Sequence, residues 1–177
     1  MVAQRFQTEE QVQQYLAQAF PSLQFEEPIS FQHGWVCRPK LTPEEIARGM
    51  DLGLTSYVVN RETGVVTVHP SLHPFTIGEM YDQAIEAGQP VQGAQIYPHR
   101  TRTTIQRTHE DSETIQYQVR IESLIQPPEP TEEFQLTITK HPLRIRPTWA
   151  RATRAAAWAE WKSRQDGTWP EQGTFED

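Results

Sequence analysis

Apolar positions recur three and four residues apart in four stretches of the chain, which predicts four helices. The first, TEEQVQQYLAQAF, has Thr8 and Gln11 as a capping box and ends at Pro21. The second, LTPEEIARGM, is shorter and has Thr42 and Glu45 as its capping box.

The third and fourth helices follow later in the chain. FTIGEMYDQAIEAG is expected to begin at Thr76 as N-cap, with Glu79 completing a capping box and with Phe75 and Met80 as a hydrophobic staple. PTWARATRAAAWAEWKSRQ, which ends before Gly167, is the longest predicted helix.

Other stretches carry β-branched and aromatic residues or alternate between apolar and polar positions. PISFQHGWVCRP predicts a strand over about Ile29–Arg38, with a bulge at Gly34. SYVVN and VVTVH predict a hairpin buried on both faces, with Gly64 in its turn. TRTTIQRTH, ETIQYQVRIESLI and FQLTIT predict antiparallel strands, the second with one exposed polar face. The fold class is therefore α+β, with an antiparallel sheet of meanders and hairpins packed against helices and a C-terminal helix.

The order of these elements predicts the domain organisation. Residues 1–98 are expected to form an α+β core, and residues 99–167 a β-hairpin with the C-terminal helix, packed on that core as one domain. Residues 168–177 are expected to be a loose tail.

The charge is uneven along the chain, whose net charge is −7. Residues 1–98 hold 5 Lys and Arg against 11 Asp and Glu, a net of −6, whereas residues 99–177 hold 11 against 12, a net of −1. This balance argues against general binding to nucleic acid or to an anionic membrane, and it suits either a basic partner or simple solubility. Cys37 is the single cysteine, the first residues show no signal peptide, and no apolar run reaches the roughly 18 residues of a membrane span. A cytoplasmic location is expected.

Residues with chemical potential are few and scattered. His69 and His73 are four apart, but a proline follows each, so they cannot share a helix face as zinc ligands do. Cys37 shares a strand face with Trp35 and is expected to be a buried thiol rather than a nucleophile. His99, His109 and His141 lie in or beside turns and are expected to be solvated, and no glycine-rich phosphate loop is present. The sequence predicts no enzyme, no metal and no cofactor.

The last helix is the best candidate for binding a partner. At 100° per residue Trp158, Trp161, Arg151 and Arg154 fall on one side, and Trp149, Ala152 and Ala156 on the other. Trp and Arg are the residues that most often dominate protein interfaces, which favours an interface on the first side. Alternatively, Trp158 and Trp161 belong to the core and the arginines flank them.

Three motifs, FQHGWVC, YVVNRETGVVTVHPSLHPF and IGEMYDQAIEAG, follow one another within residues 31–88. Through them this part of the chain resembles the YrhB-type immunity-protein family of bacterial polymorphic toxin systems. Asn60 and Arg61 stand where the family often has Asp-Lys, and Val65 where it often has Glu. The resemblance implies an α+β scaffold without catalytic residues that blocks a toxin.

Three functions are therefore open at this point. The first is a non-catalytic immunity protein that binds and neutralises a cognate toxin. The second is a chaperone or adaptor for a secreted effector, and the third is an enzyme of unrecognised type. The sequence does not indicate the toxin, its chemistry or the oligomeric state.

Overall fold

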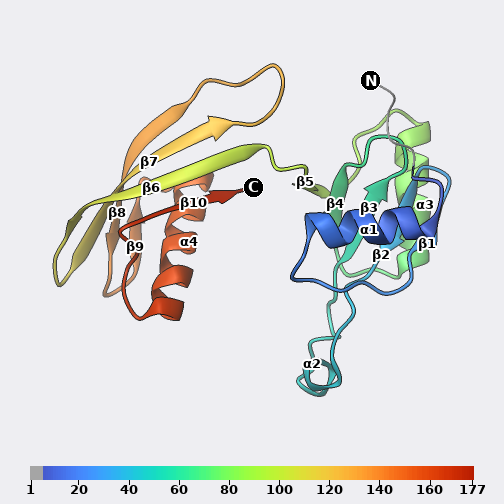
Figure 1. Cartoon of the computed structure of the whole chain (residues 1–177), viewed down its shortest axis with the longest axis horizontal. Helices are drawn as coiled ribbons and strands as arrows, with labels where there is room; N and C mark the ends of the chain where they lie inside the picture. Colours follow the sequence, from blue (N-terminus) through green and yellow to red (C-terminus); the bar gives the residue numbers. More distant parts are fainter. Residues whose placement is uncertain (1–5) are drawn as a thin grey trace. The chain divides into compact units, whose positions relative to one another are not determined.

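The computed structural model describes residues 6–177 and divides the chain into two compact units, Met1–Pro98 and His99–Asp177 (Figure 1). Each unit has its own antiparallel sheet and its own helices, so the predicted α+β class is confirmed. That the two parts pack together as one domain stays a prediction. Within the described residues, none of the helices combines the length and the apolar character needed to cross a membrane.

The first unit contains a five-stranded meander in the order β1-β2-β3-β4-β5. One helix packs on each face of this sheet. A third, short helix belongs to the segment of chain that connects β2 to β3 (Figure 1). The elements are α1 (Glu9–Ala19), β1 (Ile29–Ser30), β2 (Gly34–Cys37), α2 (Pro43–Ala47), β3 (Ser56–Asn60), β4 (Val66–His69), α3 (Pro74–Glu86) and β5 (Ala94–Tyr97).

Local hydrogen bonds confirm the first two predicted helix starts. Thr8 and Gln11 form the capping box of α1, and Thr42 and Glu45 that of α2. Each box satisfies backbone N–H groups that the first turn of a helix leaves without partners. The partners in each box are only three residues apart, so these two starts could be predicted from the local sequence.

The β3–β4 hairpin is the centre of the unit and is buried on both faces, as predicted. Val59 and Val66 pack with α1, whereas Val58 packs with α3. Gly64 closes the turn with a φ of 73°, a value that glycine adopts without strain. The Tyr15 hydroxyl donates a hydrogen bond of 2.7 Å to the Gly64 carbonyl and ties α1 to this turn.

The predicted strand over Ile29–Arg38 is wrong, because β1 and β2 are two strands of a hairpin. The carboxylate of Asp82 on α3 accepts hydrogen bonds from the backbone N–H groups of Gln32 and His33, at 3.0 and 2.8 Å. These bonds fix the turn between the strands. Gly34 is not a bulge; a Cβ there would lie 3.0 Å from Val58 Cγ1, so glycine allows β2 to approach β3 closely.

The predicted start of the third helix is also wrong. α3 begins at Pro74 with His73 as N-cap, three residues before Thr76. Proline suits the first helical position because its φ is already helical and its missing N–H would have no partner there. Phe75 and Met80 are 54% and 38% exposed, so they do not form a buried staple.

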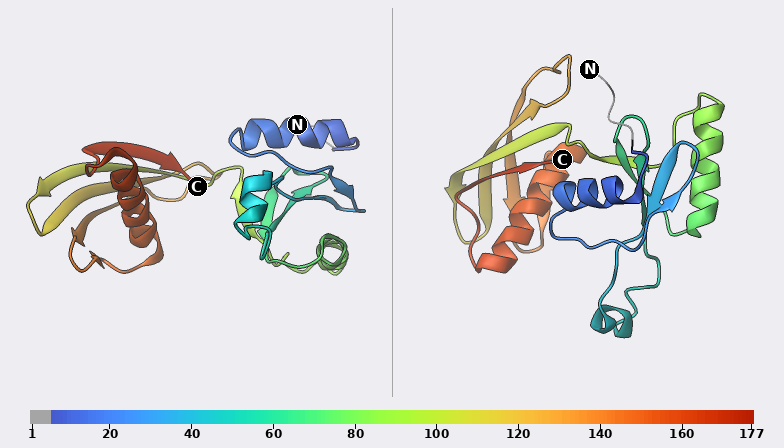
Figure 2. Two further views of the ribbon diagram at one scale, coloured as in Figure 1. Left: turned by 90° about the horizontal axis from the view of Figure 1, so that it is seen from below. Right: turned by 45° about the vertical axis from the view of Figure 1, so that its right-hand side comes forward.

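The second unit contains a five-stranded sheet in the order β10-β6-β7-β8-β9, with α4 against one face (Figure 2). The alternation predicted for β7 is confirmed: its apolar side chains are buried beneath α4 and its polar side chains lie on the other face. The elements are β6 (Thr101–Glu110), β7 (Thr114–Ser123), β8 (Glu132–Thr139), β9 (Arg144–Arg146), α4 (Ala150–Asp166) and β10 (Gln172–Glu176).

The residues from Thr168, expected to be loose, instead supply an edge strand of this sheet. β10 pairs with β6 over its whole length. Arg102 donates two hydrogen bonds to the Glu176 carboxylate, at 3.0 and 2.8 Å, and Phe175 stacks on Trp158 of α4. The strand is thus held both in its own sheet and against the helix.

Candidate partner-binding site

The helix α4 buries a face of small residues, and this decides which of its other side chains are exposed. Ala152, Ala155, Ala156 and Ala159 are the buried residues of the helix. At 100° per residue, Trp161 and Arg154 lie on the opposite side, and Trp158 and Arg151 lie on one flank. The periodicity of the sequence therefore grouped the four residues correctly but did not reveal that alanine forms the core face.

The two tryptophans have different environments. Trp161 is 53% exposed, and the Lys162 ammonium lies 6.0 Å from the centroid of its ring. Trp158 is half-buried, and its ring stacks on that of Phe175 with 5.4 Å between the ring centroids. The ring lies so close to Gly173 that a Cβ at that position would be 2.1 Å from it. Trp158 thus holds β10 against the helix, and Trp161 is the tryptophan available to a partner.

The two arginines already have carboxylate partners in the free chain. Arg151 pairs with Glu132 and lies 3.6 Å from Glu129, and Arg154 pairs with Asp177. The side chains of Arg151 and Arg154 are 38% and 61% exposed, so these pairs stabilise the fold only weakly. A partner carboxylate could exchange with either pair at low cost.

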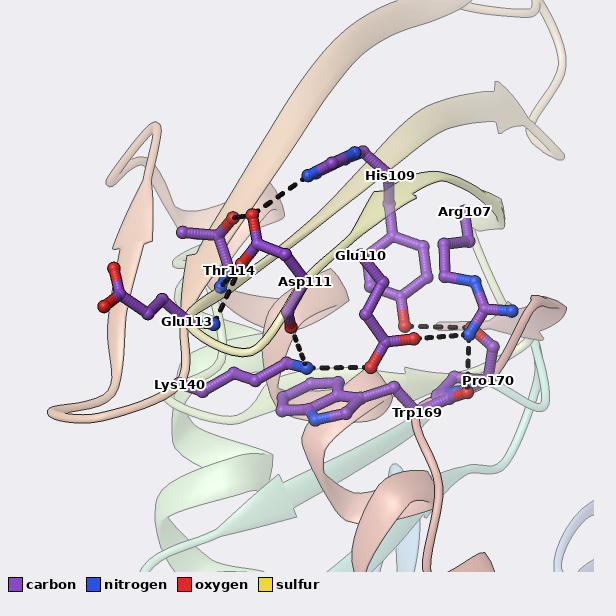
Figure 3. A network of polar contacts seen from close by, with 10 residues as sticks. Arg107, His109, Glu110, Asp111, Glu113, Thr114, Lys140, Trp169 and Pro170 are labelled. Carbon is purple, nitrogen blue, oxygen red and sulfur yellow. Dashed lines mark hydrogen bonds and ion pairs between the residues drawn. The ribbon is translucent and has the colours of Figure 1, made fainter.

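A polar network at the end of the β6–β7 hairpin was not evident from the sequence (Figure 3). Arg107 pairs with Glu110 at 2.6 Å and with Glu171 at 2.9 Å, and Lys140 donates to Glu110 at 2.8 Å. Since its partners lie up to 64 residues apart in sequence, only the folded chain brings them together. These charges are paired with one another, so the network ties the hairpin to neighbouring segments.

His109 belongs to the same region and is exposed, as predicted, but it also has a hydrogen-bond partner. Its Nε2 lies 3.0 Å from the Asp111 carboxylate, which also accepts from the Glu113 and Thr114 N–H groups. The hydrogen bond with His109, followed by these backbone bonds, holds the pKa of Asp111 well below its usual range. This carboxylate therefore orders the turn and stays ionised.

A cavity of about 420 Å³ lies in the first unit beside α3. Its wall is mainly aliphatic, with Ile77 and Met80 from the helix, and its two titratable side chains are His69 and Tyr81. His69 Nε2 is 2.8 Å from the Thr67 hydroxyl, and the Tyr81 hydroxyl accepts a hydrogen bond of 2.9 Å from Asn60. Because these polar groups bond to the sheet, the cavity favours binding of an apolar group over acid–base chemistry.

His69 is expected to make the stability of the first unit depend on pH. Burial lowers its pKa below the ordinary value of 6.5. Below pH 6.5 the unfolded chain then binds more protons than the folded chain, so the free energy of unfolding falls as the pH drops toward the folded pKa. Urea unfolding across this range measures the slope.

His69→Gln should flatten this slope, whereas His141→Gln, at an exposed turn, should leave it unchanged. Equal slopes in the parent and in His69→Gln would show that the histidine does not control this dependence.

Cys37 is fully buried, and burial raises the pKa of its thiol to about 12. The thiol is therefore protonated near neutral pH, which disfavours a role as nucleophile. Among residues 6–177, no three His, Cys, Asp or Glu side chains gather in a way that could hold a metal ion. That the protein needs no metal or cofactor stays a prediction.

The fold and these surfaces define a small α+β protein whose exposed tryptophan, exchangeable ion pairs and aliphatic cavity suit contact with another protein. Residues 7–89 match the model of the family described as Immunity protein 35-like domain. The match confirms the resemblance of the first unit to an immunity-protein family; the YrhB-type label stays a prediction. No curated protein and no solved structure matches the chain.

Proposed function

We propose that the chain is a non-catalytic immunity protein that binds and neutralises one cognate bacterial toxin in the cytoplasm. The observation that carries this proposal is the Immunity protein 35-like match over residues 7–89. The low reactivity of Cys37 and the paired state of the network around Arg107 are consistent with inhibition by binding alone. Such an inhibitor covers the active site of the toxin or blocks its assembly.

The partner-binding surface that we propose is the exposed side of α4. Trp161 would insert into the toxin as the main anchor, and Arg151 and Arg154 would exchange their present carboxylates for those of the toxin. Trp158 would border the contact while it supports β10. The acidic first half of the chain would steer a basic toxin toward the complex, which affects the association rate most.

Affinity purification from the native host tests the proposed function. The tagged full chain should retain one dominant protein in stoichiometric amount, and that protein should stop growth when it is expressed alone. Retention of many unrelated proteins would instead support the chaperone or adaptor. Mass spectrometry identifies the bound protein in either case.

Trp161→Ala is expected to weaken binding to that purified toxin by about 2 kcal/mol or more, the loss typical of an interface hot spot. The melting temperature should stay close to that of the parent, because Trp161 is 53% exposed.

Raised salt should slow association of the wild-type chain with the toxin more than it speeds dissociation, since screening acts on long-range steering. Surface plasmon resonance at two salt concentrations measures both rates.

Trp149→Ala is the matched control, because Trp149 is 54% exposed and is the N-cap of the same helix. It should bind the toxin with nearly parental affinity. Full affinity of Trp161→Ala would exclude this side of α4 as the interface, and the polar face of β7 with Gln116, Gln118 and Arg120 would be tested next.

A further inference from the structure

The segment between β2 and β3 stands away from the sheet of the first unit as an arm, defined here as residues 42–53 (Figure 1). Residues 46–53 are all exposed, and α2 buries none of its side chains. None of the residues of the arm belongs to a core cluster. The arm therefore contributes nothing to the packing that holds the sheet together.

Local hydrogen bonds nevertheless give the arm a defined shape. Its helix begins with the Thr42–Glu45 capping box, at 2.8 and 3.2 Å. The chain then turns back through hydrogen bonds from Gly49 N to Ile46 O and from Leu52 N to Gly49 O, at 2.9 and 3.2 Å. Gly49 has a φ of 75°, which glycine allows at this helix end. These hydrogen bonds give the backbone of the arm a defined course although its side chains are exposed.

Three large apolar side chains lie on this arm. Ile46 and Met50 are each 50% exposed, and Leu52 is 83% exposed. Exposed apolar side chains that cluster on a short segment mark contact sites, since burial of each in a partner is favourable. Three of them lie within seven residues on an element that supports no core, so packing within the first unit does not account for them.

We propose that the arm inserts Ile46, Met50 and Leu52 into an apolar groove on the toxin, and that Lys and Arg at the rim of this groove face the acidic residues of the arm. The arm is then a second docking element, separate from the exposed side of α4. This inference rests on the proposed function, since it takes the toxin as the partner.

Charge selects a basic protein as the occupant rather than a second copy of this chain. The arm holds Glu44, Glu45 and Asp51 against Arg48, a net charge of −2. In a second copy, the arm could enter the aliphatic cavity beside α3. The helix that lines this cavity also carries acidic residues, and residues 1–98 have a net charge of −6. Two copies would thus bring like charges together, whereas a groove with a basic rim is complementary.

Two variants of the full chain test the arm. The first, Ile46→Ser/Met50→Ser/Leu52→Ser, removes the apolar contact. The second, Glu44→Lys/Asp51→Lys, reverses the charge and leaves the capping box intact. Leu143→Ser is the control, because Leu143 is 48% exposed and lies in the second unit. The probe is the purified toxin that the wild-type chain neutralises.

The triple serine variant should bind this toxin at least about tenfold more weakly and keep its melting temperature within about a degree. The charge-reversed variant should associate more slowly, and the control should bind within about twofold of the parent.

Parental affinity of the triple variant for a toxin that the wild type neutralises would overturn the proposed role of the arm alone and leave the proposed function intact. If sedimentation instead shows that the wild type is a dimer and the triple variant a monomer, and both bind the toxin equally well, the occupant is a second copy. If the wild type neutralises no toxin, both proposals fail.

Discussion

Trp35→Ala is expected to lower the free energy of unfolding of the first unit by about 3–5 kcal/mol, the usual cost of removing a buried aromatic side chain. Trp35 is only 6% exposed and packs in the same cluster as Val59 and Val66. Its ring N–H donates a hydrogen bond of 2.9 Å to the Phe6 carbonyl, and the Arg61 guanidinium lies 4.7 Å from the ring centroid. Alanine would leave a cavity and an arginine without its aromatic neighbour, and the Phe6 carbonyl would keep only the hydrogen bond of 3.0 Å that Arg61 donates to it.

Urea unfolding followed by circular dichroism measures this effect. Trp161→Ala is the matched control, because it removes the same side chain from a position that is 53% exposed, and it should change stability little. A melting temperature for Trp35→Ala within a degree or two of the parent would contradict the central place of Trp35 in the core.

Leu136→Ala is expected to cost the second unit about 2–5 kcal/mol. Leu136 is fully buried on β8, where it pairs with Tyr117 of β7 and contributes to the core beneath α4. The rigid sheet on one side and the alanine face of the helix on the other leave little freedom to fill the space. The resulting cavity therefore keeps most of its cost.

Leu143→Ala provides the comparison for this position. Leu143 is 48% exposed, so its truncation should change the free energy of unfolding by well under about 1 kcal/mol. Equal losses in the two variants would show that β8 does not face a close-packed core. Unfolding curves recorded for both variants in the same buffer make this comparison.

The features that the sequence predicted well depend on residues close together in the chain. The capping boxes at Thr8 and Thr42 involve partners three residues away, and the alternation of β7 follows from the pleat of a single strand. The valine-rich β3–β4 hairpin could be predicted for the same reason, because its turn has only a few residues.

The features that the sequence missed depend on distant partners or on competing local signals. The turn between β1 and β2 requires Asp82, about fifty residues away, and β10 requires β6, about seventy residues away. At the start of α3, His73 with Pro74 and Thr76 with Glu79 are both acceptable caps, and the structure has the first, with Pro74 buried.

That Trp158, Trp161, Arg151 and Arg154 bind a partner stays a prediction, and the structure shows only where these side chains lie. Helical periodicity placed Trp161 with Arg154, but it did not show that alanines form the buried face or that Trp158 supports β10. The role that we propose for the arm does not follow from the sequence, because Ile46 and Met50, four residues apart, have the spacing of a buried helix face. Only their exposure in the folded chain distinguishes the two roles.

The most direct test of the proposed function is growth of bacteria that express the toxin identified by affinity purification, with and without this chain. The wild-type chain is expected to restore growth by forming a stoichiometric complex, without covalent change to the toxin. Trp161→Ala and the triple serine variant of the arm should each require higher expression to give the same protection. Growth arrest that persists at high levels of folded wild-type chain, despite a complex with the toxin, would contradict the claim that this protein neutralises its partner by binding.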